Sequence, residues 1–219
     1  MSKTVLALVP HPDDAEFSAG GTLAKMAGEG ASVVIVVATD GGAGSLHYDS
    51  ATLAQLRAEE SRRAAAVLGA EPPVLLGHPD SGLDLLLPGV LREQFVRLIR
   101  THKPDVVIAE DPFAPYEVHP DHRAVAWAAS DAANFAQLPL FCPEHRQEGL
   151  EPHFVVEKYW YGSDPASANR IVDITATIDI KVAAIAAHAS QVQFLIEDLL
   201  LQARLAGIDL QAQLGGERR

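Results

Sequence analysis

The sequence has little cysteine and little positive charge, and both shortages narrow the classes of function. Cys142 is the single cysteine in 219 residues, so no intramolecular disulfide framework forms, and we expect a reducing compartment, the cytoplasm. Lysine and arginine total 17 against 29 acidic residues, a formal net charge of −12, and no basic cluster occurs. This balance argues against nucleic-acid binding. We expect a small-molecule ligand instead.

Several sequence signatures are also absent. No run of 18 apolar residues and no basic leader with a cleavage site occurs, so neither membrane insertion nor export is expected. The first loop reads HPDDAE where a nucleotide-binding module on such a sheet needs Gly-x-Gly-x-x-Gly. No Gly-x-Ser-x-Gly elbow for a serine hydrolase is present. A thiol nucleophile at Cys142 is disfavoured, because the sequence indicates no group to orient the nearby His145.

Apolar runs of strand length alternate with segments of helical period, which predicts an α/β fold. The runs cover 4–10, 32–40, 73–77 and 105–111, and the intervening helices are expected at 18–29, 52–69 and 88–102. The runs are nearly continuous in Val, Ile and Leu, as in parallel strands with helices on both faces. We therefore predict a Rossmann-like, three-layer fold with a mostly parallel sheet, one domain over residues 1–219, and a long helix at 176–206.

Four loops rich in acid and histidine follow the four predicted strands. They contain HPDD (11–14), TDGGAG (39–44), GHPDSG (77–82) and EDPFAPYEVHPDH (110–122). Ligands of open parallel sheets bind beyond the carboxyl ends of the strands. The sequence therefore predicts that the active site lies at this rim.

Two of these loops carry histidine and aspartate at a spacing that suits a metal. His11 and Asp14 are three residues apart, and His119 and His122 repeat that spacing with Asp121 between them. A catalytic zinc keeps three N or O ligands and one open position, which two histidines and one carboxylate provide. Asp121 is expected to orient His119 or His122 from the second shell of ligands. Alternatively, the aspartates cap the following helix and the histidines are solvated turn residues.

The chain resembles the PIG-L/LmbE family of zinc-dependent N-deacetylases across residues 4–195. The resemblance rests on HPDD, "GGTLAKMAGEGASVVIVVATDG", "RAEESRRAAAVLGA", "KPDVVIAEDP", "HPDHRAV" and "DITATIDIKVAAIAAHASQ". It implies a metal-dependent hydrolase that removes the N-acetyl group from an N-acetylglucosamine-type substrate. Two alternatives are a zinc amidase that cleaves another amide of a sugar conjugate and a non-catalytic sugar- or metal-binding protein.

The resemblance also implies roles for individual residues. His11, Asp14 and His122 become the ligands of one Zn²⁺, which Fe²⁺ can replace at such N/O sites. Asp13 becomes the general base, and His119 stabilises the oxyanion or protonates the leaving amine.

Other residues are expected around this centre. Arg57, which resembles the arginine of the family's "R..E" helix, is expected to reach the substrate, and Asp80 and Tyr116 are candidates for substrate binding. Asp40, like Asp121, is expected in the second shell, and the sequence assigns no role to His188 or to the rest of loop 112–118. The expected partner is a small amino sugar, and the resemblance suggests a homo-oligomer, a trimer or hexamer.

Overall fold

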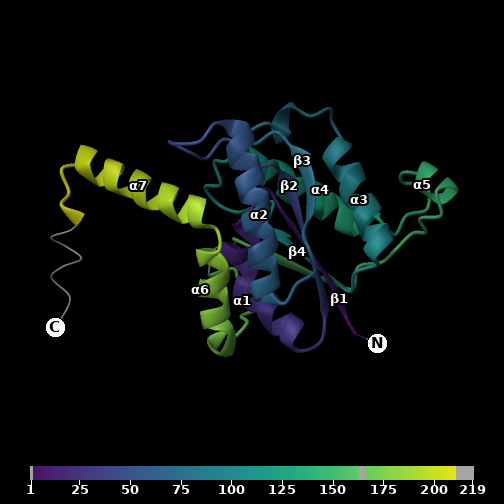
Figure 1. Ribbon diagram of the computed structural model, residues 1–219. Helices are drawn as coiled ribbons and strands as arrows, with labels where there is room; N and C mark the ends of the chain where they lie inside the picture. The colour runs from purple at the N-terminus through teal and green to yellow at the C-terminus, as the bar shows by residue number, and fades with distance from the viewer. Residues whose placement is uncertain (1, 163–165, 211–219) are drawn as a thin grey trace.

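The computed structural model describes residues 2–162 and 166–210 of the chain (Figure 1). Five strands form one sheet in the order β3-β2-β1-β4-β5, and every neighbouring pair is parallel. The strands are β1 (Thr4–Val9), β2 (Ser32–Thr39), β3 (Val74–His78), β4 (Val106–Glu110) and β5 (Glu157–Tyr161). The predicted α/β fold is confirmed, and its first strand lies at the centre of the sheet.

Helices cover both faces of this sheet (Figure 1). Because side chains alternate along a strand, Val5 and Ala7 of β1 pack on one face, while Leu6 and Leu8 pack on the other. One face is covered by α1 (Asp14–Gly28), α2 (Ser50–Leu68) and α6 (Ile178–Ala186), and the other by α3 (Val90–His102) and α4 (Pro120–Phe135). Burial of each valine or leucine side chain contributes about 1.5 to 3 kcal/mol to folding.

The boundaries of α2 follow local signals in the sequence. The carboxylate of Asp49 accepts a hydrogen bond from the backbone N–H of Thr52, 2.9 Å away, at the start of α2. The same helix ends at Gly69, whose φ of 75° is the left-handed conformation that glycine adopts without strain. The first helix begins at Asp14 rather than at residue 18, so the acidic loop turns directly into α1.

The prediction of one long helix at 176–206 is wrong. Helix α6 ends at Ala186, and a separate helix α7 (Ala189–Leu205) begins after a turn at His188. The carboxylate of Glu60 on α2 accepts hydrogen bonds from the backbone N–H of Ser190 at 2.9 Å and from its hydroxyl at 2.6 Å. A side chain from another helix therefore caps the start of α7, and no local glycine or proline marks the break.

The remaining elements are three short helical segments and a projecting helix. A 3₁₀ turn (Leu83–Leu85) precedes α3, α5 (Glu144–Gln147) follows α4, and a second 3₁₀ turn (Thr175–Thr177) precedes α6. Helix α7 extends away from the body (Figure 1) and exposes apolar side chains such as Leu199 and Leu205. Within the described residues, none of the helices has the length and apolar character needed to span a membrane.

Candidate active site and metal centre

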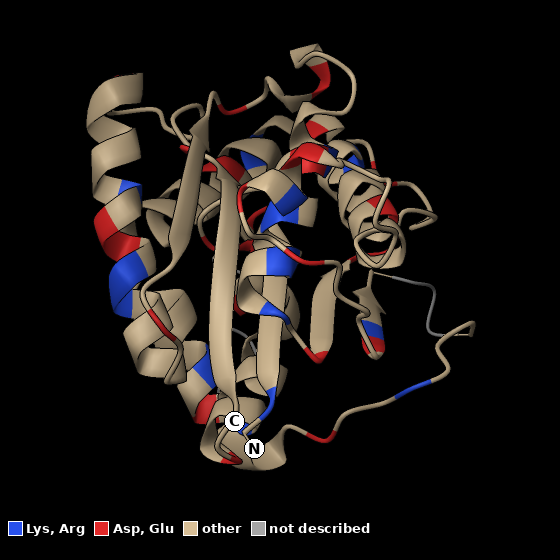
Figure 2. Ribbon diagram, turned by 90° about the vertical axis from the view of Figure 1, so that its right-hand side faces the viewer, with Lys and Arg blue, Asp and Glu red and all other residues tan. Residues whose placement is uncertain are grey.

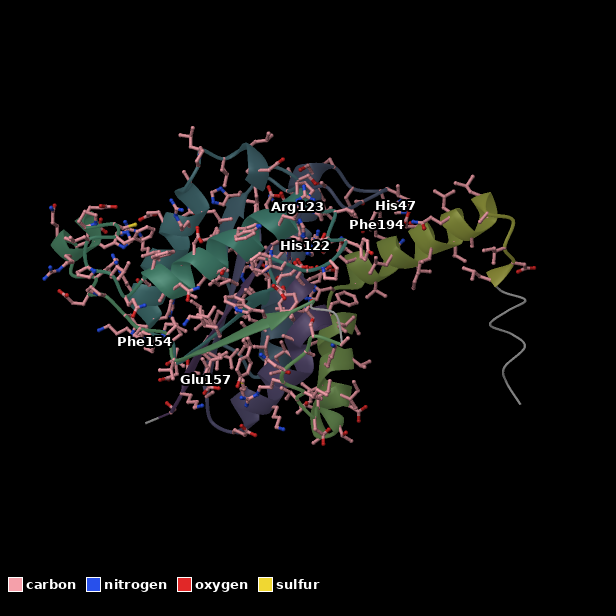
Figure 3. The ribbon with its side chains drawn as sticks, turned by 180° about the vertical axis from the view of Figure 1, so that it is seen from behind. His47, His122, Arg123, Phe154, Glu157 and Phe194 are labelled. Carbon is pink, nitrogen blue, oxygen red and sulfur yellow. The ribbon has the colours of Figure 1, made fainter. Side chains whose placement is uncertain are left out.

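The predicted loops meet at the carboxyl ends of the central strands. His11 follows β1, Asp80 follows β3, and His119 and His122 lie at the start of α4, after β4. Acidic segments occupy several loops at the end of the sheet opposite the N-terminus (Figure 2). His122 projects from the first turn of α4 (Figure 3).

The three predicted metal ligands, His11, Asp14 and His122, face one another. The Nδ1 atom of His11 lies 3.2 Å from Oδ2 of Asp14, and Nε2 of His122 lies 3.6 Å from the same oxygen. One ligand atom from each of the three residues lies within 4.8 Å of the other two. Two imidazole nitrogens and one carboxylate oxygen are a donor set typical of a catalytic zinc site.

Carboxylates hold the outward nitrogens of both histidines. The Nε2 atom of His11 lies 3.2 Å from Oδ2 of Asp121 and 3.2 Å from Oδ1 of Asp80, and Nδ1 of His122 lies 2.8 Å from Oε2 of Glu110. Metal-binding histidines usually donate their other N–H to such a carboxylate, which fixes the tautomer and the ring orientation. The donor set therefore fits a divalent metal ion.

The charge around His11 also suits a cation. Burial alone would lower the pKa of His11, but contacts with Asp121, Asp14 and Asp80 raise it to about 11. The contact with His11 also holds the pKa of Asp14 below its usual value, against the effect of burial. Three carboxylates thus converge on one imidazole, an excess of negative charge that a divalent ion balances.

Other groupings of acidic residues and histidines at this rim are less suitable for binding a metal ion. His11, Asp80, His119 and Asp121 also form a cluster. However, the Asp121 carboxylate already accepts hydrogen bonds from the backbone N–H groups of Ser81, at 2.7 Å, and Leu83, at 3.0 Å. The grouping of His11, Asp14 and His122 is therefore the more suitable donor set for a metal ion.

Asp13 sits beside this set in a strained backbone conformation. Its φ is 120°, which is rare for a residue with a side chain, and such strain persists where surrounding contacts enforce it. The side chain makes no capping hydrogen bond to α1, so the alternative that Asp13 caps this helix is wrong. Burial raises the pKa of Asp13 to about 7, although the nearby Arg57 guanidinium lowers it. Asp13 thus has a pKa suited to accepting a proton near neutral pH.

Arg57 holds the Asp13 loop from α2. Its guanidinium donates hydrogen bonds to the carbonyl oxygens of Pro12, at 2.6 Å, and Gly41, at 2.9 Å, and lies 3.3 Å from Oδ2 of Asp13. A Cβ on Gly41 would lie 2.9 Å from this guanidinium, so glycine permits the close approach. The Arg57 side chain is only 4% exposed. In the structure these contacts direct the guanidinium to the Asp13 loop, and the expectation that Arg57 reaches the substrate stays a prediction.

His119 presents one ring nitrogen to the site. The backbone N–H of Asp121 donates to Nδ1 of His119, 3.2 Å away, so the proton of the neutral ring is on Nε2. The His119 ring lies 4.7 Å from the His11 ring, centroid to centroid. Burial, together with the positive charge of His11 and His122, lowers the pKa of His119. A neutral imidazole with an Nε2–H donor can therefore face the reacting centre.

The other predicted residues lie at different distances from the centre. Asp40 accepts hydrogen bonds from the backbone N–H groups of Gly42 and Asp80. It therefore stabilises the loop that carries Asp80 and does not itself contact a proposed metal ligand in these hydrogen bonds. Asp80 itself contacts His11 and the backbone N–H of Ala43, and its side chain is buried. Tyr116 is exposed and has a positive φ of 64°.

Two details differ from the sequence interpretation. The carboxylate of Asp121 orients His11. Among the described residues, this carboxylate makes no hydrogen bond with the ring of His119 or of His122. Glu110 was not predicted, although an acid at the last position of a strand followed by HPDH is a usable signal. His188, between α6 and α7, is wholly buried, and its Nε2 lies 3.4 Å from Oε2 of Glu16 on α1, although neither ring nitrogen has a hydrogen-bond partner among the described residues.

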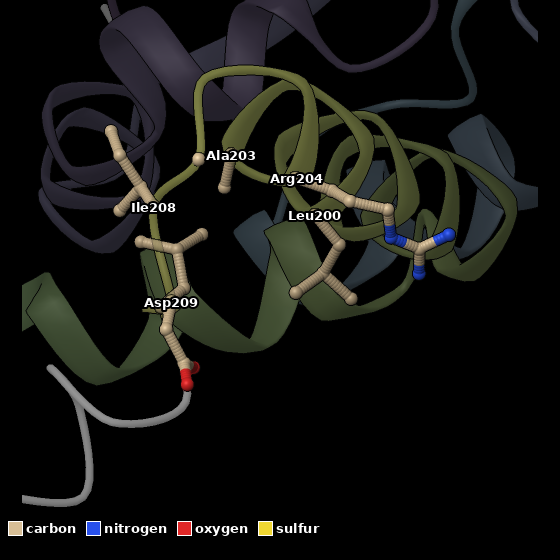
Figure 4. Close-up of a pocket in the computed structure, with 7 residues that line it drawn as sticks. Leu200, Ala203, Arg204, Ile208 and Asp209 are labelled. Carbon is tan, nitrogen blue, oxygen red and sulfur yellow. The ribbon is translucent and has the colours of Figure 1, made fainter.

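Two surface hollows lie away from this cluster. One, of 480 Å³, is at the end of α7 and is lined by Leu200, Ala203, Arg204, Ile208 and Asp209, among others (Figure 4). The other, of 720 Å³, lies between α1 and the edge strand β5. Neither contains a residue of the His11–Asp14–His122 set.

Comparison with known proteins decides the family. The sequence model of the PIG-L family, described as GlcNAc-PI de-N-acetylase, matches residues 6–133. The chain belongs to the PIG-L family. Among PIG-L relatives, the diacetylchitobiose deacetylase of Thermococcus kodakarensis is 35% identical, over 86% of this chain and 70% of the relative. The 1D-myo-inositol 2-acetamido-2-deoxy-alpha-D-glucopyranoside deacetylase of Mycobacteroides abscessus is 31% identical, over 83% and 78%. The resemblance predicted from HPDD and HPDH is confirmed.

Solved structures agree with the PIG-L assignment. The N,N'-diacetylchitobiose deacetylase from Pyrococcus horikoshii superposes with a TM-score of 0.79 at 35% identity, over 86% of this chain and 70% of that chain. The 4-carboxy-2-hydroxymuconate hydratase GalB from Pseudomonas putida superposes with a TM-score of 0.73 at 22% identity, over 99% and 91%. Because a hydratase shares the fold, the activity has to be argued from the site residues and the deacetylase relatives.

Proposed function

We propose that this PIG-L protein is a metal-dependent deacetylase that removes the N-acetyl group from an N-acetylglucosamine-type substrate. The observation that carries the proposal is the pairing of a candidate three-residue metal set, His11, Asp14 and His122, with the strained Asp13 beside it, whose side chain is 13% exposed. The named relatives, deacetylases of diacetylchitobiose and of a glucosaminyl inositol, support this substrate class.

The proposed chemistry assigns one task to each residue. His11, Asp14 and His122 would hold the metal ion, which when bound would supply Lewis-acid polarisation of the amide carbonyl and a water of lowered pKa. Asp13 accepts the proton of the attacking water, and Arg57 holds the Asp13 loop in position. His119 donates its Nε2–H to the developing oxyanion or to the departing sugar amine. We propose Zn²⁺ as the metal because it favours mixed nitrogen and oxygen ligands, and Fe²⁺ is the alternative.

Three finer points remain proposals. An amidase acting on a larger acyl group would use the same metal set and differ in the pocket near Tyr116. A cytoplasmic location rests on the single cysteine, Cys142. A homo-oligomer is supported by the exposed apolar side chains of α7, since such patches mark interaction surfaces. Light scattering of the purified chain tests the last point.

The deciding experiment measures amine release from N-acetylglucosamine and from diacetylchitobiose. Metal-depleted protein, zinc-restored protein and zinc-restored Asp13→Asn are compared, with the exposed Asp84→Asn as the matched control. We expect zinc-dependent release that Asp13→Asn abolishes while its zinc content stays equal to that of the wild type. Zinc binding without amine release from either sugar, but with release from larger acylated amines, would favour the amidase. Zinc binding without turnover of any amide would contradict the proposal.

A further inference from the structure

Hydrogen bonds from one buried arginine fix the loop that follows α4. Arg100 on α3 is 1% exposed, and its guanidinium donates hydrogen bonds to four backbone carbonyls between 2.7 and 3.1 Å away. These carbonyls belong to Ala136, Leu138, Phe141 and Cys142. Cys142 has a positive φ of 51°, which is unfavourable for a residue with a side chain. The fold thus fixes Cys142 in a strained conformation.

His145, three residues later on α5, is completely buried and has one unsatisfied nitrogen. Its Nε2 lies 2.6 Å from Oε1 of Glu93 on α3, which supplies the orienting partner that the sequence did not reveal. Its Nδ1 has no hydrogen-bond partner among residues 2–162 and 166–210. With the proton on Nε2, Nδ1 carries a free lone pair. A buried acceptor without a partner costs about 1 to 3 kcal/mol, so this nitrogen is suited to a ligand.

A thiol and a carboxyl lie close to this ring. One ligand atom from each of Cys142, Glu144 and His145 lies within 4.8 Å of the other two. Ligands of a tetrahedral zinc at about 2.0 to 2.3 Å lie roughly 3.3 to 3.8 Å apart, so side-chain movements on the order of 1 Å close the site. Glu93 stands behind the imidazole as carboxylates do behind many metal-bound histidines.

We propose that Cys142, Glu144 and His145 form a second metal site, which binds Zn²⁺ with water in the fourth position. Binding releases the thiol proton to solvent, because the thiolate is the ligand. The site is separate from the catalytic set, since α4 has 16 residues, about 24 Å, and its first turn carries His122 while its end leads to the Cys142 loop. Burial and the charge of Glu144 raise the pKa of the Cys142 thiol in the metal-free chain, which argues against an activated nucleophile.

Cobalt titration of the metal-depleted full chain tests this proposal directly. Cys142 is the single thiol, and the catalytic set contains no sulfur, so thiolate-to-cobalt charge-transfer absorption in the near ultraviolet reports the second site alone. We expect this absorption to saturate at one equivalent per chain, to disappear in Cys142→Ser and to be removed by added zinc. Cys142→Ser should keep the deacetylase activity of the zinc-loaded wild type, because Cys142 lies outside the catalytic set.

A matched pair of surface variants tests the carboxylate ligand. Glu144→Gln should bind cobalt at the thiolate site at least tenfold more weakly, while Glu151→Gln, an exposed glutamate of the same segment outside the cluster, should bind like the wild type. Cobalt that fills the catalytic set without any thiolate absorption would overturn the proposal. Equal affinity of Glu144→Gln and Glu151→Gln would also overturn it, because the three-ligand site would then be wrong.

Discussion

The Nδ1 atom of His122 lies 2.8 Å from Oε2 of Glu110, the last residue of β4. This contact leaves Nε2 as the nitrogen that faces Asp14. The orientation of a proposed metal ligand thus depends on the end of a buried strand that pairs with β1 and β5.

Replacing Glu110 should therefore weaken metal binding without unfolding the chain. In Glu110→Gln the amide is a poorer acceptor for the His122 N–H, and loss of such a partner typically costs 10- to 100-fold in metal affinity. Competition with a chromophoric chelator measures the affinity, and the exposed Glu29→Gln serves as control. Unchanged affinity in Glu110→Gln would show that His122 needs no carboxylate to orient it.

Arg57→Lys should lower kcat rather than raise KM. Lysine keeps the charge but not the fork that joins the carbonyls of Pro12 and Gly41, so the Asp13 loop loses its support. A misplacement of about 1 Å costs on the order of 10²-fold in rate. Steady-state kinetics with metal content measured in parallel tests this, and Arg63→Lys on the exposed side of α2 is the control. A rise in KM with constant kcat would instead assign Arg57 to substrate binding.

Glu60→Gln should destabilise the start of α7. The carboxylate accepts two hydrogen bonds from Ser190, whereas the single amide oxygen of Gln can accept only one, and loss of one hydrogen bond costs about 0.5 to 1.5 kcal/mol of unfolding free energy. Urea unfolding compares this variant with Glu59→Gln, whose ion pair with Arg62 is exposed and contributes little. The prediction fails when both variants unfold at the same urea concentration.

The stability that the Asp49 cap contributes to α2 should decrease at low pH. Hydrogen bonds from the backbone N–H and hydroxyl of Thr52 lower the pKa of Asp49 below its usual 3.8. Its contribution is therefore complete above that value and is lost as the pH falls through the lower, folded-state pKa. Asp49→Asn keeps a capping oxygen that does not titrate. The Tm advantage of the wild type over Asp49→Asn should shrink between pH 5 and about pH 2. An advantage that stays constant over this range would contradict the assignment, and Asp84→Asn is the control.

The sequence predicted strands β1 to β4 and the end of the sheet that carries the candidate site, because both depend on local patterns; the edge strand β5 was not predicted. Continuous runs of Val, Ile and Leu identify buried parallel strands, and the carboxyl ends of such strands meet at one rim. His11, Asp14 and His122 could therefore be grouped from their places in the chain. The direction of the Asp121 side chain could not be predicted from the sequence. Its carboxylate contacts His11 and also accepts a hydrogen bond from a backbone N–H of the loop after β3.

The sequence did not predict the features that depend on contacts between residues far apart in the chain. The break between α6 and α7 is capped by Glu60, 130 residues earlier in the chain. Arg57 turns toward Asp13 because Gly41 and Pro12 offer it carbonyls, and a residue on a helix does not reveal which loop it will meet. Glu93 orients His145 across 52 residues, a pairing that spacing does not indicate.

All residues assigned to the proposed reaction lie between His11 and His122, and the PIG-L match ends at residue 133. The chain beyond that point supplies the edge strand β5 and the projecting helix α7, and none of the proposed reacting groups. A change of sequence confined to β5 or α7 therefore alters none of the proposed reacting groups themselves.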